Sequence, residues 1–412
     1  MAAATTQVID RPHTPTIDIQ ALLDSRQATP GEFQTKSIEV LQKTLGELVT
    51  ELDPQDTVRP FDQCKVRYYG EKIGWSFRNE DASWTTPMTM THRAFRQAGS
   101  KVLGQGGLDF AERTRQTGPS GSDLATINWM YHLGQSESRG LFRSMKFPGE
   151  RYRTIRGVLS GSDRGFMTNL DNMDVVNLLA ESASFRELPI IDWKITHDTM
   201  RIRFLLDPAD SALFDANGRL LNPGNSHDTS LKIPVPMGEI LNGEVGNHAV
   251  IFTDALWTFA CLNGMVSHGG KDNSNSFTRR WAHVGGNDRG EKIQAAIGDS
   301  IKSARIAANG QVEAFKAATT VAISDAFALL DHIGRKEGHI TRAQAQRAAT
   351  AINDETSYPG RNLAAVISGV TLAAQSETDI DRQREMERFA SRLMAKGLQM
   401  GHATGAIVIP EA

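Results

Sequence analysis

The apolar residues of this chain change their spacing several times, and each spacing predicts a different element. The first apolar run consists of Ile38, Leu41, Leu45, Leu48 and Leu52. These positions recur every three or four residues and end before Pro54, so they predict an amphipathic helix. Residues 1–34 show no such periodicity and mix Thr, Pro, Asp and Gln, which is typical of a flexible arm.

Two stretches alternate apolar and polar residues, as the strands of a hairpin do. The first lies between Cys64 and Phe77, and the second includes residues 193–195 and 200–204 on either side of a short turn. Because successive side chains of a strand point to opposite faces, Ile202 and Phe204 are expected in the core. Lys194, Arg201 and Arg203 would then share the other face, which predicts a basic surface turned outward.

Further elements follow from local signals. Residues 124–145 have the character of a helix, and Asp171 is placed to cap a helix that has Asp174 in its first turn. After Gly290 the chain has a helical pattern to its end. We therefore predict an α+β fold, with an antiparallel sheet domain, flanking helices and a C-terminal helical region. The predicted divisions are 1–34 as the arm, 35–285 as the α+β core domain and 286–412 as the helical region.

Charge along the chain is uneven, although the net charge of the 412 residues is only −3. The stretch from Arg139 to Phe166 holds seven lysines and arginines against Glu150 and Asp163, and aromatic residues are interleaved with them. Guanidinium forks and flat rings suit a phosphate backbone and unstacked bases. The predicted nucleic-acid-binding residues are Arg139, Arg143, Arg151, Arg153, Arg156, Arg164, Lys194, Arg201, Arg203, Arg279 and Arg280.

Catalytic motifs have little support. The only two cysteines, Cys64 and Cys261, are far apart and match no disulfide framework or zinc spacing. Asp163, Glu244 and His283 are weak candidates for a metal site, because turn and ion-pair roles explain the two carboxylates as well. We predict no cofactor, and the sequence leaves open whether the chain is an enzyme.

Several ordered motifs resemble those of a known family. They are LSGSDRGFMTNLDNMDVV, PMGEILNGEVGNHAVIF, FACLNGMV and RRWAHVGG. Together they resemble the phage/plasmid-like proteins of domain of unknown function 932, whose members carry a Leu-Ser-Asp-Arg-Tyr turn, Asp-Asn, Asn-Ser-Glu-Val-Gly, Cys-Thr-Asn-Gly and His-x-Gly. This chain departs from the pattern by inserting Gly161 and Ser162, and by having Gly165, Gly243 and Leu262 where the family has Tyr, Ser and Thr. The resemblance implies a phage or plasmid setting.

These observations predict a phage- or plasmid-encoded DNA-handling protein. It would bind single-stranded DNA non-specifically along a basic sheet face and assemble into homo-oligomers, as annealing proteins do. One alternative is a metal-dependent nuclease or hydrolase, and another is a phage structural or assembly protein. No apolar run of 18 residues and no leader pattern are present, so we expect no membrane partner and a location in the bacterial host cytoplasm.

Overall fold

The structure is a computed structural model. It describes residues 37–69, 72–115, 119–148, 150–160, 170–196, 198–207, 234–246, 248–258, 263–266, 276–283, 289–337, 340–354, 362–377, 380–404 and 407–408. The predicted arm, residues 1–34, lies outside the described residues. So do Cys261, Asp163 and Arg164.

A six-stranded, half-barrel sheet forms the first half of the molecule, with strand order β1-β5-β6-β4-β3-β2. Its strands are β1 (Gln55–Pro60), β2 (Cys64–Tyr69), β3 (Lys72–Phe77), β4 (Met88–Met90), β5 (Arg139–Met145) and β6 (Thr154–Ser160). A short 3-10 helix (Phe61–Gln63) precedes β2. Strands β4 and β6 are parallel, whereas the other neighbours in this sheet are antiparallel. The antiparallel arrangement predicted from the sequence therefore holds for every described pair of this sheet except β4 with β6.

The same half of the molecule contains three helices, α3 (His92–Val102), α4 (Gly104–Arg115) and α5 (Pro119–Gly134). Thr91 caps helix α3, because its Oγ1 accepts the Ala94 N–H at 3.1 Å. Trp75 and Trp129 are fully buried and meet edge to face, 5.7 Å apart. This small core joins α5 to the sheet.

A second sheet, antiparallel throughout its described pairs, has the order β11-β10-β9-β8-β7, and β12 also pairs with β10. Its strands are β7 (Ile190–Ile195), β8 (Met200–Leu205), β9 (Val235–Asn242), β10 (Val250–Thr258), β11 (Asn263–Val266) and β12 (Thr278–Trp281). Helices α2 (Ile38–Leu52), α6 (Asn172–Glu181) and α7 (Ala183–Arg186) belong to the same half. The predicted helix over 38–52 and the predicted hairpin of β7 and β8 are confirmed.

The remaining helices are α8 (Arg289–Ala318), α9 (Ala326–Glu337), α10 (Arg342–Asp354), α11 (Leu363–Gln375) and α12 (Ile380–Thr404). A two-stranded pair, β13 (Ala322–Ile323) with β14 (Ile407–Val408), ties the segment after α8 to the chain end. The larger hydrophobic core takes residues from α2, from the second sheet and from α8 to α12. It therefore spans both sides of position 285. No helix in the described part of the chain is long and apolar enough to cross a membrane.

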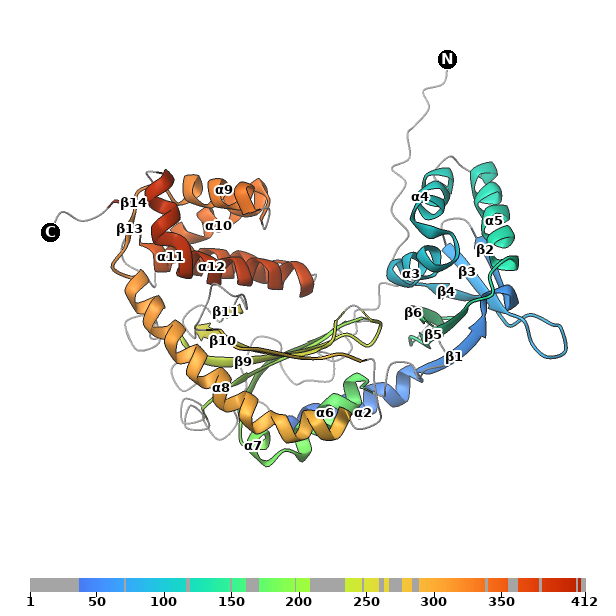
Figure 1. The fold of residues 1–412 in the computed structure, drawn as a ribbon, viewed down its shortest axis with the longest axis horizontal. Coiled ribbons are helices and arrows are strands. Elements are labelled where there is room, and N and C mark those ends of the chain that lie inside the picture. The colour runs from blue at the N-terminus through green and yellow to red at the C-terminus, as the bar shows by residue number, and fades with distance from the viewer. Residues whose placement is uncertain are drawn as a thin grey trace, which may run out of the picture.

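The ribbon forms an open arc (Figure 1). Helices α3, α4 and α5 lie at one end and α9 and α10 at the other, with α8 along the outer side of the second sheet and α12 on its inner side. The predicted α+β class, with a C-terminal run of helices, is confirmed. The helix predicted over 124–145 is wrong beyond Gly134, because Arg139–Met145 forms strand β5. Side chains on both faces of β5 are buried, so its sequence lacks the alternation of apolar and polar residues that marks a half-exposed strand.

Candidate functional site

The structure separates the predicted nucleic-acid-binding residues into buried and exposed groups. Arg143, Arg156, Arg201 and Arg203 are buried, each at most 5 % exposed, and each forms an ion pair with a carboxylate. Arg153 is half-buried and pairs with Asp53 at 2.7 Å. The remaining described members are Arg139, Arg151, Arg279 and Arg280, which are exposed, and Lys194, which is half-buried. A continuous exposed stripe over 139–166 is therefore not formed by the described residues.

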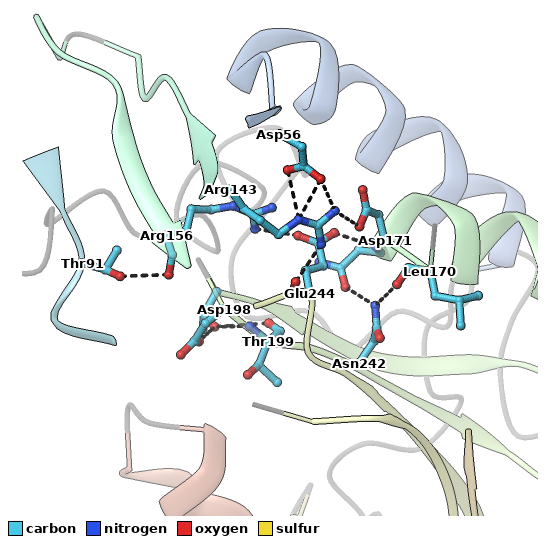
Figure 2. A network of polar contacts seen from close by, with 12 residues as sticks. Asp56, Thr91, Arg143, Arg156, Leu170, Asp171, Asp198, Thr199, Asn242 and Glu244 are labelled. Atoms are coloured by element: carbon cyan, nitrogen blue, oxygen red, sulfur yellow. Dashed lines mark hydrogen bonds and ion pairs between the residues drawn. The ribbon is translucent and has the colours of Figure 1, made fainter. Parts of the chain in front are cut away.

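Arg143 lies at the junction between the two sheets (Figure 2). Its Nε and Nη2 donate to the carboxylate of Asp56 at 2.8 to 3.1 Å, its Nη1 donates to the Glu244 carbonyl at 2.7 Å, and Nη2 lies 2.6 Å from Asp171 Oδ1. A planar guanidinium can hold several acceptors at fixed angles, which a lysine cannot. Arg143 therefore joins β1 and β5 to the start of α6 and to the segment after β9.

Glu244 is the acidic centre of this junction. Its Oε2 accepts from Arg156 Nη1 at 2.6 Å, and its Oε1 accepts the Asn172 N–H at 2.6 Å. Arg156 and Arg143 lower the pKa of Glu244 against the opposing effect of burial, which is the largest single influence. The side chain of Asn242 adds a bond to Asn172 Oδ1 at 2.9 Å. The Asp171-Asn172 and Asn242–Gly246 motifs of the family resemblance thus meet in space.

Asp171 caps α6 as predicted, in a reciprocal capping box with Asp174 in which the Asp171 N–H donates to Asp174 Oδ2 at 2.9 Å. Its carboxyl also borders a cavity of about 130 Å³ that Asn172 and Glu244 share and that the apolar residues of α2 close. Burial, and next the charge of Glu244, raise the pKa of Asp171 to about 6. A carboxyl with this pKa exchanges its proton close to neutral pH.

The raised pKa of Asp171 has a consequence for stability. The folded chain binds this proton at a pH at which the unfolded chain has released it, so this carboxyl stabilises the fold as pH falls from 7 towards 5 and loses that contribution as pH rises through 6. Asp171→Asn keeps an N-cap side chain and cannot titrate. We expect its urea-unfolding free energy to depend less on pH between 5 and 7 than that of the wild type.

Asp299→Asn removes an exposed carboxylate from α8 and serves as the control for charge alone. Its pH profile should follow that of the wild type. A wild-type profile that Asp171→Asn reproduces over this range would show that the carboxyl does not titrate there.

A second ionic network lies between the second sheet and α12. The register places Lys194, Arg201 and Arg203 on one face, as predicted, but the prediction that this face is turned outward is wrong. Arg203 pairs with Glu239 at 3.1 Å and with Glu387 of α12. The carboxylates that neutralise these arginines come from β7, from β9 and from a helix far along the chain.

Helix α12 contributes two further residues to this network. Arg384 Nε donates to Glu239 Oε1 at 2.6 Å, and Gln383 accepts from Arg201 at 2.9 Å. Arg201 also pairs with Asp192 at 2.6 Å. Glu239 is fully buried; burial by itself would raise its pKa, but Arg384 and Arg203 outweigh that effect and hold the pKa at about 2. Glu239 is therefore charged and shared between two guanidinium groups.

A group of arginines lies where this network meets α12. Four arginines, which we call the arginine cluster, gather there: Arg280, Arg384, Arg388 and Arg392. Burial first, then the charges of Arg384, Arg280 and Arg392, lower the pKa of Arg388 to about 10 in spite of Glu239. The Nε of Arg388 is buried and has no hydrogen-bond partner among the described residues.

The neighbouring pair Arg279 and Arg280 divides between the two faces of the sheet. Arg280 is opposite Ile251, which packs with Ile380 of α12, whereas Arg279 is opposite Phe252 and bonds Ser300 of α8 at 3.2 Å. Of the two predicted binding residues, Arg280 therefore belongs to the arginine cluster, whereas Arg279 contacts α8 on the opposite face of the sheet.

The predicted metal candidates are not assembled by the described residues. Glu244 is held by Arg156 and the Asn172 N–H, and His283 is buried. Asp163 lies outside the described residues. Within the part of the chain that the structure describes, no group of three His, Cys, Asp or Glu side chains is arranged to hold a metal ion.

The residues predicted from the sequence to bind nucleic acid did not include Arg384, Arg388 and Arg392, although the spacing of these arginines is visible in the sequence. The apolar stripe of Met386, Phe389 and Leu393 marks this segment as a helix, and arginines at every fourth position mark a second line along it. Acidic residues lie between these arginines and offset their charge, so the local net charge of the segment does not reveal the row.

Comparisons with known proteins add no name to this geometry. No protein-family model, no curated protein and no solved structure matches the chain. The resemblance to phage/plasmid-like proteins therefore rests on the motifs alone, and the buried junction and the arginine cluster are the features from which a function is inferred.

Proposed function

We propose that this chain binds single-stranded nucleic acid, without sequence preference, along the inner side of its arc. The observation that carries the proposal is the arginine cluster, in which Arg384, Arg280 and Arg392 surround Arg388, and the buried Nε of Arg388 has no hydrogen-bond partner among the described residues. Bringing like charges together is costly unless an anion joins them. A phosphate group, which accepts two parallel N–H bonds from a guanidinium, is such an anion.

The arrangement of the cluster favours a polymer over one small anion. Arg384 is buried and bound to Glu239, whereas Arg388 and Arg392 are half-buried and lie four positions apart on α12. At 1.5 Å of rise per residue, their positions are spaced by about 6 Å along one line. A row of cations suits a chain of phosphates, and a single row suits one strand better than the two strands of a duplex.

Two further observations support this proposal. Helix α12 lies on the inner side of the arc, where a bound strand would contact the protein along its length (Figure 1). The resemblance to phage/plasmid-like proteins adds a setting in which DNA is processed. The proposed binding surface differs from that expected from the sequence, because Arg143, Arg156, Arg201 and Arg203 stabilise the fold from within.

Fluorescence anisotropy with a labelled oligothymidylate, measured over a range of salt concentrations, tests the proposal. The variant Arg280→Gln, Arg388→Gln, Arg392→Gln should bind more weakly. Removing three phosphate contacts should reduce the slope of log K against log salt by about 2, since each contact to a single strand contributes about 0.7. An oligouridylate of equal length shows whether DNA is preferred to RNA.

The matched control is Lys43→Gln, Arg113→Gln, Lys302→Gln, which removes the same charge from exposed positions on α2, α4 and α8. Its salt slope should equal that of the wild type. Two results oppose the proposal: wild-type binding that is absent or insensitive to salt, and equal losses in the two triple variants, which would reflect net charge alone.

A further inference from the structure

The first half of the molecule has its own hydrophobic core. It is one continuous piece, residues 55–160, which the chain enters before β1 and leaves after β6. Among the described residues, its buried cluster draws on β2, β3, β5, β6 and α3 to α5, and on no strand of the second sheet. Of its described residues, only Met145 and Phe147 belong to the larger core. A unit connected in this way can change its angle to its neighbour without opening its core.

Two groups of polar contacts between the halves differ in their burial. The first is the junction around Arg143 and Glu244, where the ion pair of Glu244 with Arg156 is at most 10 % exposed. Gln97 of α3 adds a bond from its Nε2 to the Val245 carbonyl at 2.7 Å. Salt screens buried ion pairs much less than exposed ones. This junction is therefore the firm contact between the halves.

The second group lies where α3 meets the turn between β7 and β8 and the start of α12. Arg93 Nε donates to Asp198 Oδ2 at 2.8 Å, and Arg93 Nη2 lies 3.9 Å from Asp381 Oδ2. The Nε2 of His248, which precedes β10, is 2.7 Å from Asp381 Oδ1. We call Arg93, Asp198, His248 and Asp381 the clasp. Its side chains are between 17 % and 39 % exposed.

The clasp consists of contacts that can break while both cores stay folded. Ion pairs with this exposure contribute little to stability, and salt weakens them further. Its position gives it leverage. Helix α3 belongs to one end of the arc and α12 runs along the inner side, so the clasp joins two parts whose separation sets the width of the arc (Figure 1).

We propose that the arc opens about the buried junction and that the clasp holds it at the width seen here. Release of Arg93 from Asp198 and Asp381 lets the first half move away from α12 while Arg143 and Glu244 stay bound. The inference does not depend on nucleic-acid binding. An opening would nevertheless change access to the arginine cluster, because Asp381 lies one turn before Arg384 on α12.

Distances between two spin labels test the proposal. The variants Asp123→Cys on α5 and Ala343→Cys on α10 place labels at exposed positions towards opposite ends of the arc. Cys261→Ser leaves Cys64 as the other thiol, which is buried and does not react, because burial raises its pKa to about 12. In double electron–electron resonance at low salt, the chain with an intact clasp should give one narrow distance distribution. Adding Arg93→Gln should broaden the distribution and shift it to longer distances.

Two further measurements separate opening from other effects. Asp198→Asn removes the clasp from the other half and should reproduce the shift seen with Arg93→Gln. Raising the salt concentration to about 1 M, where charges are screened beyond about 3 Å, should shift the chain with an intact clasp in the same direction. The distribution of Arg93→Gln should hardly respond to salt.

Arg96→Gln is the matched control, since it removes the same charge from an exposed position of α3 outside the clasp. Its distribution should equal that of the chain with an intact clasp at both salt concentrations. Thermal midpoints close to that of the wild type will show that the variants fold. The proposal is overturned if Arg93→Gln and Asp198→Asn leave the distances unchanged, as expected of a rigid arc. It is also overturned if Arg96→Gln produces the same shift, which would reflect the charge of α3 alone.

Discussion

Glu239→Gln is expected to destabilise the chain by about 3 to 5 kcal/mol, the usual cost of removing one partner from a buried ion pair. Glu239 is fully buried and accepts from Arg203 at 3.1 Å and from Arg384 at 2.6 Å. Its neutralisation leaves Arg203 with Glu387 as an ion-pair partner and removes the carboxylate to which Arg384 donates. Urea unfolding followed by circular dichroism measures the loss.

The position of the effect can be measured as well as its size. Because Arg384 belongs to α12, hydrogen exchange should accelerate in α12 and in β8 and β9 more than in β2 and β3 of the first sheet. Glu385→Gln, on the exposed side of α12, is the control and should change stability by no more than about 0.5 kcal/mol. A loss below about 1 kcal/mol for Glu239→Gln would mean that water or neighbouring groups compensate the arginines.

Glu244→Gln is expected to cost about 3 kcal/mol, because a buried charge loses its partner at the junction of the two sheets. The amide can still accept the Asn172 N–H, but it then turns an NH₂ group towards the Arg156 donor that lies 2.6 Å away. Packing leaves little room for adjustment. A Cβ at Gly157 would lie 2.7 Å from the Cβ of Val245, so the two segments are already in close contact.

Asp56→Asn provides the comparison, because Asp56 binds the same Arg143 but its side chain is 42 % exposed. Its loss should cost about 1 kcal/mol or less. Glu244→Gln should also lower the pKa of Asp171, since the charge of Glu244 contributes to raising it. The pH dependence of stability between 5 and 7 should therefore weaken in Glu244→Gln, and equal destabilisation by the two variants would contradict the central place given to Glu244.

Local signals predicted much of the fold. Apolar spacing and Pro54 gave the bounds of α2, Asp171 gave the start of α6, and alternation gave the hairpin of β7 and β8. Each of these depends on residues within a few positions of one another. The helix predicted beyond Gly134 failed because β5 is buried on both faces and therefore lacks the alternation of a half-exposed strand.

The candidate sites were predicted less well, because their residues come from distant parts of the chain. Asp171, Asn172 and Glu244 were singled out by motif, but their meeting with Arg143 and Asp56 depends on how two sheets pack. Arg280 was predicted to bind nucleic acid, yet its neighbours Arg388 and Arg392 lie more than a hundred positions away along the chain. No local window contains both parts of the arginine cluster.

By itself, the sequence determined that Lys194, Arg201 and Arg203 share one face of a sheet, because alternation in a strand is a local property. Only the tertiary structure decided what covers that face. Arg203 meets Glu387 from 184 positions away, so the same row of cations becomes an internal ionic network rather than an exposed surface. Side-chain order is encoded in the strand, whereas burial depends on which distant helix packs against it.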